Sequence, residues 1–271
     1  MRYVFDNDLH IHSKLSLCSG DPEQTNERIL QYARDNNLKT ICLTDHFWDE
    51  KVSGVKDGGA SNWYEPQNFE HICKAKPLPQ AEGIRFLFGC ETEMDMCMNV
   101  GIAKDRFDEF DFVVIPTTHF HMRGFAIPKE LDTPEQKADF WMKKLNALLD
   151  MDLPFHKIGL AHLTCGLMYA ERDKFLELIN CLKTEELERV FAKAAKKGVG
   201  IELNSDDMNF KDEEAEIVLR PYKIAKAMGC KFYCGSDAHH PNGLDCAKDI
   251  FERAIDMLEL TEEDKFHIKN M

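Results

Sequence analysis

The chain has 271 residues, of which 44% are hydrophobic and 30% are charged, and its formal net charge is −14. This composition is typical of a globular protein with a substantial core. The acidic balance argues against a long nucleic acid as a partner, and the lack of an apolar stretch of roughly 18 residues argues against a membrane span.

The N-terminus and the cysteines indicate the compartment. The first residues, "MRYVFDND", lack the apolar run of a secretory signal. The ten cysteines are scattered, many of them in apolar segments, and no CxxC pair occurs. This pattern favours reduced thiols packed as small hydrophobes over a disulfide framework. We therefore expect a cytoplasmic protein.

The first apolar run, "RYVFDNDLH", predicts a strand that leads into a row of polar residues. In an extended strand, residues two apart point to the same face. His10 and His12 should therefore lie side by side, with Asp8 on the same face.

Six further apolar runs follow, and each carries His, Glu, Asp or Asn at its C-terminal side, with helical segments between them. Strands alternating with helices predict a parallel sheet covered by helices. Seven polar strand ends fit a closed barrel better than a doubly wound sheet, because a barrel gathers all of them at one face. We expect a single domain over residues 1–271. The six runs span residues 39–46, 84–91, 110–119, 157–163, 198–205 and 231–239.

Several intervening segments carry helix signals. Residues 24–37 have apolar positions at helical spacing. Thr133 is a predicted N-cap with Gln136 placed for a capping box, and Thr184 is predicted to cap another helix. Pro221 should kink or split the helix that contains it.

The polar strand ends share the residue types that bind metal ions. So many imidazoles converging without a cation would repel on protonation or leave nitrogens unpaired. Imidazole and carboxylate are normal ligands of zinc, iron and manganese. The strand ends therefore predict a metal centre. Its candidate residues are His10, His12, His46, Glu91, His119, His162, Asp237 and His239.

In their order along the chain, these segments resemble the motifs of the PHP (polymerase and histidinol phosphatase) metallohydrolases. The similar segments, one per strand, are "DLHIH", "LTDH", "GCE", "TTHF", "LAHL" and "GSDAH". The resemblance runs essentially from end to end and is greatest to single-domain histidinol-phosphatase-like members. It implies an α/β fold: a distorted TIM-like barrel of seven (β/α) units with its metal site at the C-terminal ends of the strands.

The resemblance also implies three divalent ions, of which zinc is the first choice and iron or manganese the alternatives. The implied ligands are, for the first ion, His10, His12, Glu91 and Asp237; for the second, His119, His162 and the bridging Glu91; and for the third, His46 and His239.

Cys18 departs from the family pattern. The family usually places a His or Asp here to complete the third ion's ligands. A thiolate is a good zinc ligand, so Cys18 is a candidate. The alternative is that Cys18 only packs and that Asp21 or water completes the site.

The expected activity follows from this metal centre. Bridged divalent ions generate hydroxide from water at neutral pH and stabilise an oxyanion during displacement at phosphorus. We expect a metal-dependent phosphoesterase acting on a small phosphomonoester, with metal-bound hydroxide as nucleophile and with Glu91, Asp237 and His239 as catalytic residues. The alternatives are a phosphodiesterase or exonuclease acting on short nucleotides and a non-catalytic metal-binding protein.

The expected substrate contacts depart from the histidinol phosphatases. Those enzymes typically place an Arg after the Asn motif of the sixth strand, where this chain has Asp206 and Asp207. A carboxylate pair would repel a phosphate dianion, which makes histidinol phosphate a doubtful substrate. Lys14 and Arg123 are the candidate substrate-binding cations.

Two long segments follow strand ends and would overhang the predicted active face. Residues 47–72 contain Trp48, Trp63 and Tyr64, and residues 120–132 carry apolar side chains as well. They are candidates for lids or for packing over the barrel rim, and the aromatic side chains could stack on a planar ring of the substrate.

Overall fold

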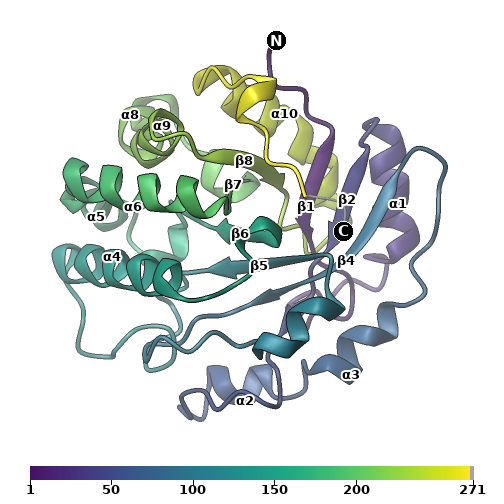
Figure 1. Cartoon of the computed structure of the whole chain (residues 1–271), viewed down its shortest axis with the longest axis horizontal. Helices are drawn as coiled ribbons and strands as arrows, with labels where there is room; N and C mark the ends of the chain where they lie inside the picture. Colours follow the sequence, from purple (N-terminus) through teal and green to yellow (C-terminus); the bar gives the residue numbers. More distant parts are fainter. Residues whose placement is uncertain (269–271) are drawn as a thin grey trace.

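A ring of parallel strands forms the centre of the protein (Figure 1), as seen in a computed structural model that describes residues 1–268. The strands follow the order β1-β2-β4-β5-β6-β7-β8, and each neighbouring pair is parallel. A short strand β3 (His46–Phe47) follows β2 and also pairs with β4. The seven strands are β1 (Asn7–Ile11), β2 (Thr40–Leu43), β4 (Arg85–Thr92), β5 (Phe112–Pro116), β6 (Ile158–Ala161), β7 (Gly200–Asn204) and β8 (Lys231–Gly235).

The ring is nearly closed between β8 and β1. Beyond the end of β8, Ala238 forms an isolated parallel bridge with Ile11. The backbone N–H of Asp237 donates to the carbonyl of His10 at 2.7 Å, and that of Cys234 donates to the side chain of Asn7 at 3.1 Å. These contacts confirm the distorted seven-stranded barrel. They also bring His10 and Asp237 together from opposite ends of the chain.

Helices surround the barrel (Figure 1). None of the described helices is both long and apolar enough to cross a bilayer. The helices are α1 (Asn26–Asp35), α2 (Ala60–Tyr64), α3 (Phe69–Ile72), α4 (Pro134–Asp150), α5 (Arg172–Cys181), α6 (Thr184–Lys197), α7 (Ser205–Met208), α8 (Ala215–Val218), α9 (Arg220–Ala227) and α10 (Pro241–Met257).

The helix boundaries test the sequence signals. The capping box of Thr133 and Gln136 is present at the start of α4, and the segment around Pro221 is split into α8 and α9. The prediction for Thr184 was wrong. Lys183 holds the N-cap position with extended backbone and no side-chain cap, so Thr184 is already helical. Acidic residues in the first turn of α6 stabilise this end through the helix dipole instead.

The barrel interior is filled with side chains. Gly159 in β6 makes room for the ring of Tyr233, because a Cβ there would lie 2.3 Å from the Tyr233 hydroxyl. Phe266, which hydrogen-bonds to the start of β8, closes the N-terminal end. The side chains that fill the interior are largely apolar, and the polar candidate ligands lie at the C-terminal ends of the strands. The interior cluster contains Leu9, Cys42, Leu87, Phe112, Val114, Ala161, Tyr233 and Phe266.

Candidate metal centre

Four side chains converge where β1, β4 and β8 end. The Nε2 atoms of His10 and His12 lie 3.1 Å apart. Asp237 Oδ1 lies 3.3 Å from His10 Nε2 and 3.0 Å from His12 Nε2. Glu91 Oε2 lies 3.5 and 3.3 Å from the same two atoms. The two imidazoles and Glu91 are almost completely buried.

The distances within this cluster and its buried carboxylate oxygens without hydrogen bonds are those of a cation site. An ion bound by four ligands at about 2.0–2.1 Å in a tetrahedron separates those ligands by about 3.3 Å. Both oxygens of Glu91 and Oδ1 of Asp237 are buried and accept no hydrogen bond from the described residues. Buried carboxylate oxygens of this kind require a cation or a donor. The four residues therefore fit a divalent ion.

A second group lies beside the first. His119, His162 and Cys165 can bring one ligand atom each within 4.8 Å of one another. His162 Nε2 also lies 3.8 Å from Glu91 Oε1 and 3.3 Å from Asp237 Oδ2. Neither ring nitrogen of His162 has a hydrogen-bond partner among the described residues. Cys165 was not identified from the sequence, where it appears as one more thiol in an apolar segment.

A third group contains His46 and His239, together with His12. The rings of His12 and His239 stack with centroids 4.1 Å apart. His46 Nδ1 lies 2.9 Å from Glu91 Oε2, which joins this group to the first. The structure therefore places all eight strand-end residues in one continuous cluster.

Cys18 lines the same cavity as His46 and His239, but it does not belong to their group of mutually close ligand atoms. Desolvation by the surrounding cavity wall and the nearby carboxylates raise the pKa of its thiol, so a bound cation would be needed to form the thiolate. Asp21 faces elsewhere. One of its oxygens accepts a hydrogen bond from the backbone of Glu23, and the other lies 3.8 Å from His240.

Asp8 does not join the cluster, contrary to the expected alternation. The pairing of β1 with β2 shifts register between Asp8 and Ile11, which breaks the two-residue period. The carboxylate of Asp8 instead accepts hydrogen bonds from the Tyr32 hydroxyl on α1 and the backbone of Ser236, both at 3.0 Å.

Two candidate ligands have backbone conformations that are rare for residues with side chains. His162 has φ 58° and Asp237 has φ 52°, in the left-handed region. Each is found just after the end of a strand. Such conformations cost on the order of 1 kcal/mol and concentrate at functional sites. Here they coincide with side chains that point into the cluster.

Buried carboxylates orient two of the imidazoles from behind. Glu202 on β7 lies 2.6 Å from His10 Nδ1 and also accepts a hydrogen bond from the backbone of His162. Glu93 lies 2.8 Å from His119 Nδ1. A partner on one ring nitrogen fixes the tautomer and turns the other nitrogen toward the metal. Neither Glu93 nor Glu202 was predicted from the sequence. For Glu202, a charged residue inside the apolar strand "GIELN" was a signal of a buried functional carboxylate.

Glu202→Gln should weaken metal binding by about 10–100-fold, because the amide keeps the size of the carboxylate but loses its charge-assisted bond to His10. Titration of chelator-treated protein with zinc measures the affinity. The matched control is Glu188→Gln, on the exposed surface of α6. Equal zinc affinity in wild type and Glu202→Gln would contradict the orienting role.

The electrostatics of the cluster keep its carboxylates charged. Burial by itself would raise the pKa of Glu91, but the His46 and His10 imidazoles hold it well below its ordinary value. Burial is likewise outweighed at Asp237, whose pKa is lowered by His10 and His239. Both groups are therefore available as anionic ligands.

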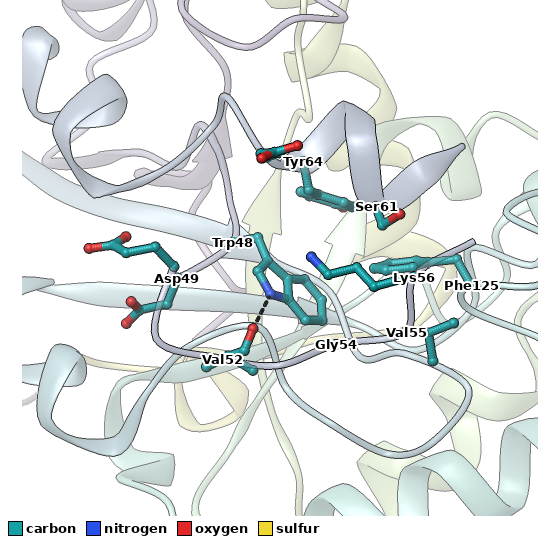
Figure 2. A pocket seen from close by; sticks show the side chains of 11 residues that line it. Trp48, Asp49, Val52, Gly54, Val55, Lys56, Ser61, Tyr64 and Phe125 are labelled. Atoms are coloured by element: carbon teal, nitrogen blue, oxygen red, sulfur yellow. Dashed lines mark hydrogen bonds between the residues drawn. The ribbon is translucent and has the colours of Figure 1, made fainter. Parts of the chain in front are cut away.

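The two long segments predicted to overhang the site form part of its wall. Trp63 and Tyr64 from the first segment and His121 and Met122 from the second line the metal cavity. The segments also pack against each other, since the ring centroids of Tyr64 and Phe125 are 5.7 Å apart. Figure 2 shows a neighbouring pocket in which the Trp48 indole donates a hydrogen bond to the carbonyl of Val52 at 3.0 Å.

The candidate substrate-binding cations lie away from the cluster. Lys14 is exposed and is not part of the cavity wall. Arg123 lines an adjoining cavity, and its guanidinium pairs with Asp132 at 2.6 Å.

Asp207, one of the two carboxylates that follow the Asn motif, is buried. It accepts hydrogen bonds from Tyr222 and the backbone of Thr164, both at 3.0 Å, and these bonds hold the loop after β6.

Comparison with known proteins identifies the family. A family model described as the PHP domain matches residues 8–206, which include every candidate ligand except Asp237 and His239. The chain belongs to the PHP family. As a member of that family, it is a metal-dependent hydrolase of phosphoric esters.

A solved structure of a distant protein has the same fold. A histidinol phosphate phosphatase from Lactococcus lactis subsp. lactis Il1403, solved with zinc, L-histidinol and phosphate, is 16% identical, with a TM-score of 0.58. The alignment covers 92% of this chain and 93% of that one. A probable 2-pyrone-4,6-dicarboxylic acid hydrolase from Acinetobacter baumannii, with citric acid bound, is 14% identical, with a TM-score of 0.42 over 96% of this chain and 97% of that one. No curated protein matches the chain.

Proposed function

We propose that this PHP protein hydrolyses a small phosphomonoester to an alcohol and inorganic phosphate. The main support is the central cluster, in which two imidazoles and two carboxylates lie 3.0–3.5 Å apart. The bond from phosphorus to the ester oxygen breaks, water supplies the new oxygen on phosphorus, and the alcohol leaves with a proton.

The proposed ligand sets assign each histidine to one ion and share Glu91 between two ions. Zinc suits the imidazole-rich sets best, with iron or manganese as alternatives. The ions, when bound, would supply a hydroxide nucleophile at neutral pH and neutralise the phosphoryl oxygens. The sets are His10, His12, Glu91 and Asp237 for the first ion; Glu91, His119 and His162 for the second; and His46, His239 and Cys18 for the third.

Three side chains have the most direct proposed roles. Glu91 joins all three groups, because its oxygens approach His12, His46 and His162. Asp237 has one oxygen near the first group and the other 3.3 Å from His162. His239 keeps 25% of its side chain exposed to the cavity, where it can contact a substrate oxygen.

Phosphate release tests the proposal. Full-length protein purified without chelator is assayed on a panel of phosphomonoesters and on a phosphodiester. Activity on monoesters should be lost on chelation and restored by zinc, iron or manganese. Metal-loaded protein that releases no phosphate, or that cleaves only the diester, would overturn it.

Cys18→Ala tests the third ion. Elemental analysis of protein purified without chelator should find about three ions per chain in wild type and about two in the variant, because the smaller side chain removes a ligand. Cys246→Ala, another exposed cysteine, is the control. About two ions in both proteins would mean that Cys18 only packs and that the centre is dinuclear.

A further inference from the structure

We propose that the substrate's organic part is a neutral planar ring, held by Trp63, Met122 and Leu167 beside the metal centre. This inference rests on the proposed phosphoesterase function and specifies its substrate class.

Within the described residues, the wall of the metal cavity, which has a volume of about 240 Å³, holds no Lys or Arg side chain. Phosphate sites normally use Arg or Lys to pair with the phosphoryl oxygens. Here the bound ions would have to balance the phosphoryl charge, and the remaining wall is left for the organic group. Apart from the candidate ligands and His121, that wall consists of Trp63, Tyr64, Met122 and Leu167.

Leu167 is largely exposed, whereas most large apolar side chains of the described residues are buried. Its side chain lies in the segment after β6, in a short 3-10 helix (Gly166–Met168), and is 48% exposed. It lines the same cavity as the candidate ligands. Covering such a side chain with an apolar group removes both surfaces from water, which favours binding.

Trp63 offers an aromatic surface to a planar group. Its contacts with His46 and Tyr64 have ring centroids 4.9 Å apart, with interplanar angles of 69° and 81°. Neither neighbour is therefore stacked parallel to the indole. A planar ring of the substrate can stack parallel to the indole, in the offset geometry that aromatic pairs favour.

An adjoining cavity of about 450 Å³ extends the wall outward and shares Trp63, His121 and Met122 with the metal cavity. Its two charged side chains each have close polar partners. Asp57 accepts hydrogen bonds from the backbone of Gly59 and Ser61, each at 3.0 Å. The Arg123 guanidinium is engaged by Asp132, and the wall that the two cavities share consists of Trp63, His121 and Met122. Aromatic and thioether side chains of this kind suit a neutral ring.

The test compares esters that differ in this group, and the benzyl and ethyl esters release alcohols of similar basicity. Metal-loaded full-length protein is assayed on benzyl phosphate, ethyl phosphate and 2-aminoethyl phosphate. We expect kcat/KM for benzyl phosphate to exceed that for ethyl phosphate by about tenfold or more, because stacking adds to apolar burial. The aminoethyl ester should be no better than the ethyl ester.

Variants locate the preference. Trp63→Ala and Leu167→Ala should each lower kcat/KM for benzyl phosphate by about 3–10-fold more than kcat/KM for ethyl phosphate, with Trp63→Phe retaining most of the preference. Leu17→Ala is the control, since Leu17 is 49% exposed but does not line the cavity. Metal content is measured for each variant because Trp63 contacts His46.

The outcomes separate the two proposals. Equal rates on benzyl and ethyl phosphate, a preference for the aminoethyl ester, or variants that lower both rates equally would overturn the ring-binding inference and leave the phosphoesterase intact. If the metal-loaded protein hydrolyses none of the three esters and no phosphomonoester of the wider panel, both proposals are overturned.

Discussion

Glu91→Ala should remove about two of the bound ions and lower kcat/KM for phosphomonoester hydrolysis by about a thousandfold or more, since metal ions contribute several kcal/mol to transition-state stabilisation. The physical reason is the position of Glu91 between the groups. Its Oε2 lies 2.9 Å from His46 and its Oε1 lies 3.8 Å from His162. Without it, neighbouring cations would lose their shared anion.

Elemental analysis and steady-state kinetics measure these effects in the same protein sample. Glu91→Gln retains the size of the side chain and separates loss of charge from a cavity in the core. Circular dichroism and the melting temperature show whether either variant folds. Glu188→Ala on the surface of α6 is the control. A folded Glu91→Ala variant with wild-type activity would contradict the bridging role.

Gly235→Ala is expected to lower the free energy of unfolding by about 1–3 kcal/mol, the usual cost of overpacking a core. A Cβ at this position would lie 2.0 Å from Glu202 Oε1 and 2.8 Å from the Cβ of His10. Glu202 is fully buried and bonded to His10 and to the backbone of His162. The Glu202 carboxylate therefore cannot move aside without breaking these hydrogen bonds.

The same substitution should weaken zinc binding, because displacing Glu202 releases the ring of His10. Denaturant unfolding of chelator-treated protein isolates the steric effect, and zinc titration measures the effect on the metal site. Gly20→Ala is the matched control, since nothing lies within 4 Å of a Cβ there. A Gly235→Ala variant as stable as Gly20→Ala and with wild-type zinc affinity would show that the end of β8 can adjust.

Local patterns determined the fold class and the candidate ligands. The apolar runs predicted all seven strands of the barrel path, because continuous apolar sequence marks a strand covered on both faces. The capping box of Thr133 and the break at Pro221 depend only on neighbouring residues. Polar residues at the strand ends were expected to meet because a parallel barrel directs all its C-terminal ends to one face.

The tertiary structure alone decided how these residues combine. The register shift in β1 turned Asp8 toward α1, and no sequence period encodes such a shift. Glu202 lies 192 residues from the His10 that it orients. Cys165 joined the second group and His12 the third because separate strand ends approach within a few ångströms. Contacts of this kind depend on the closure of the ring, whereas the sequence specifies only its individual strands.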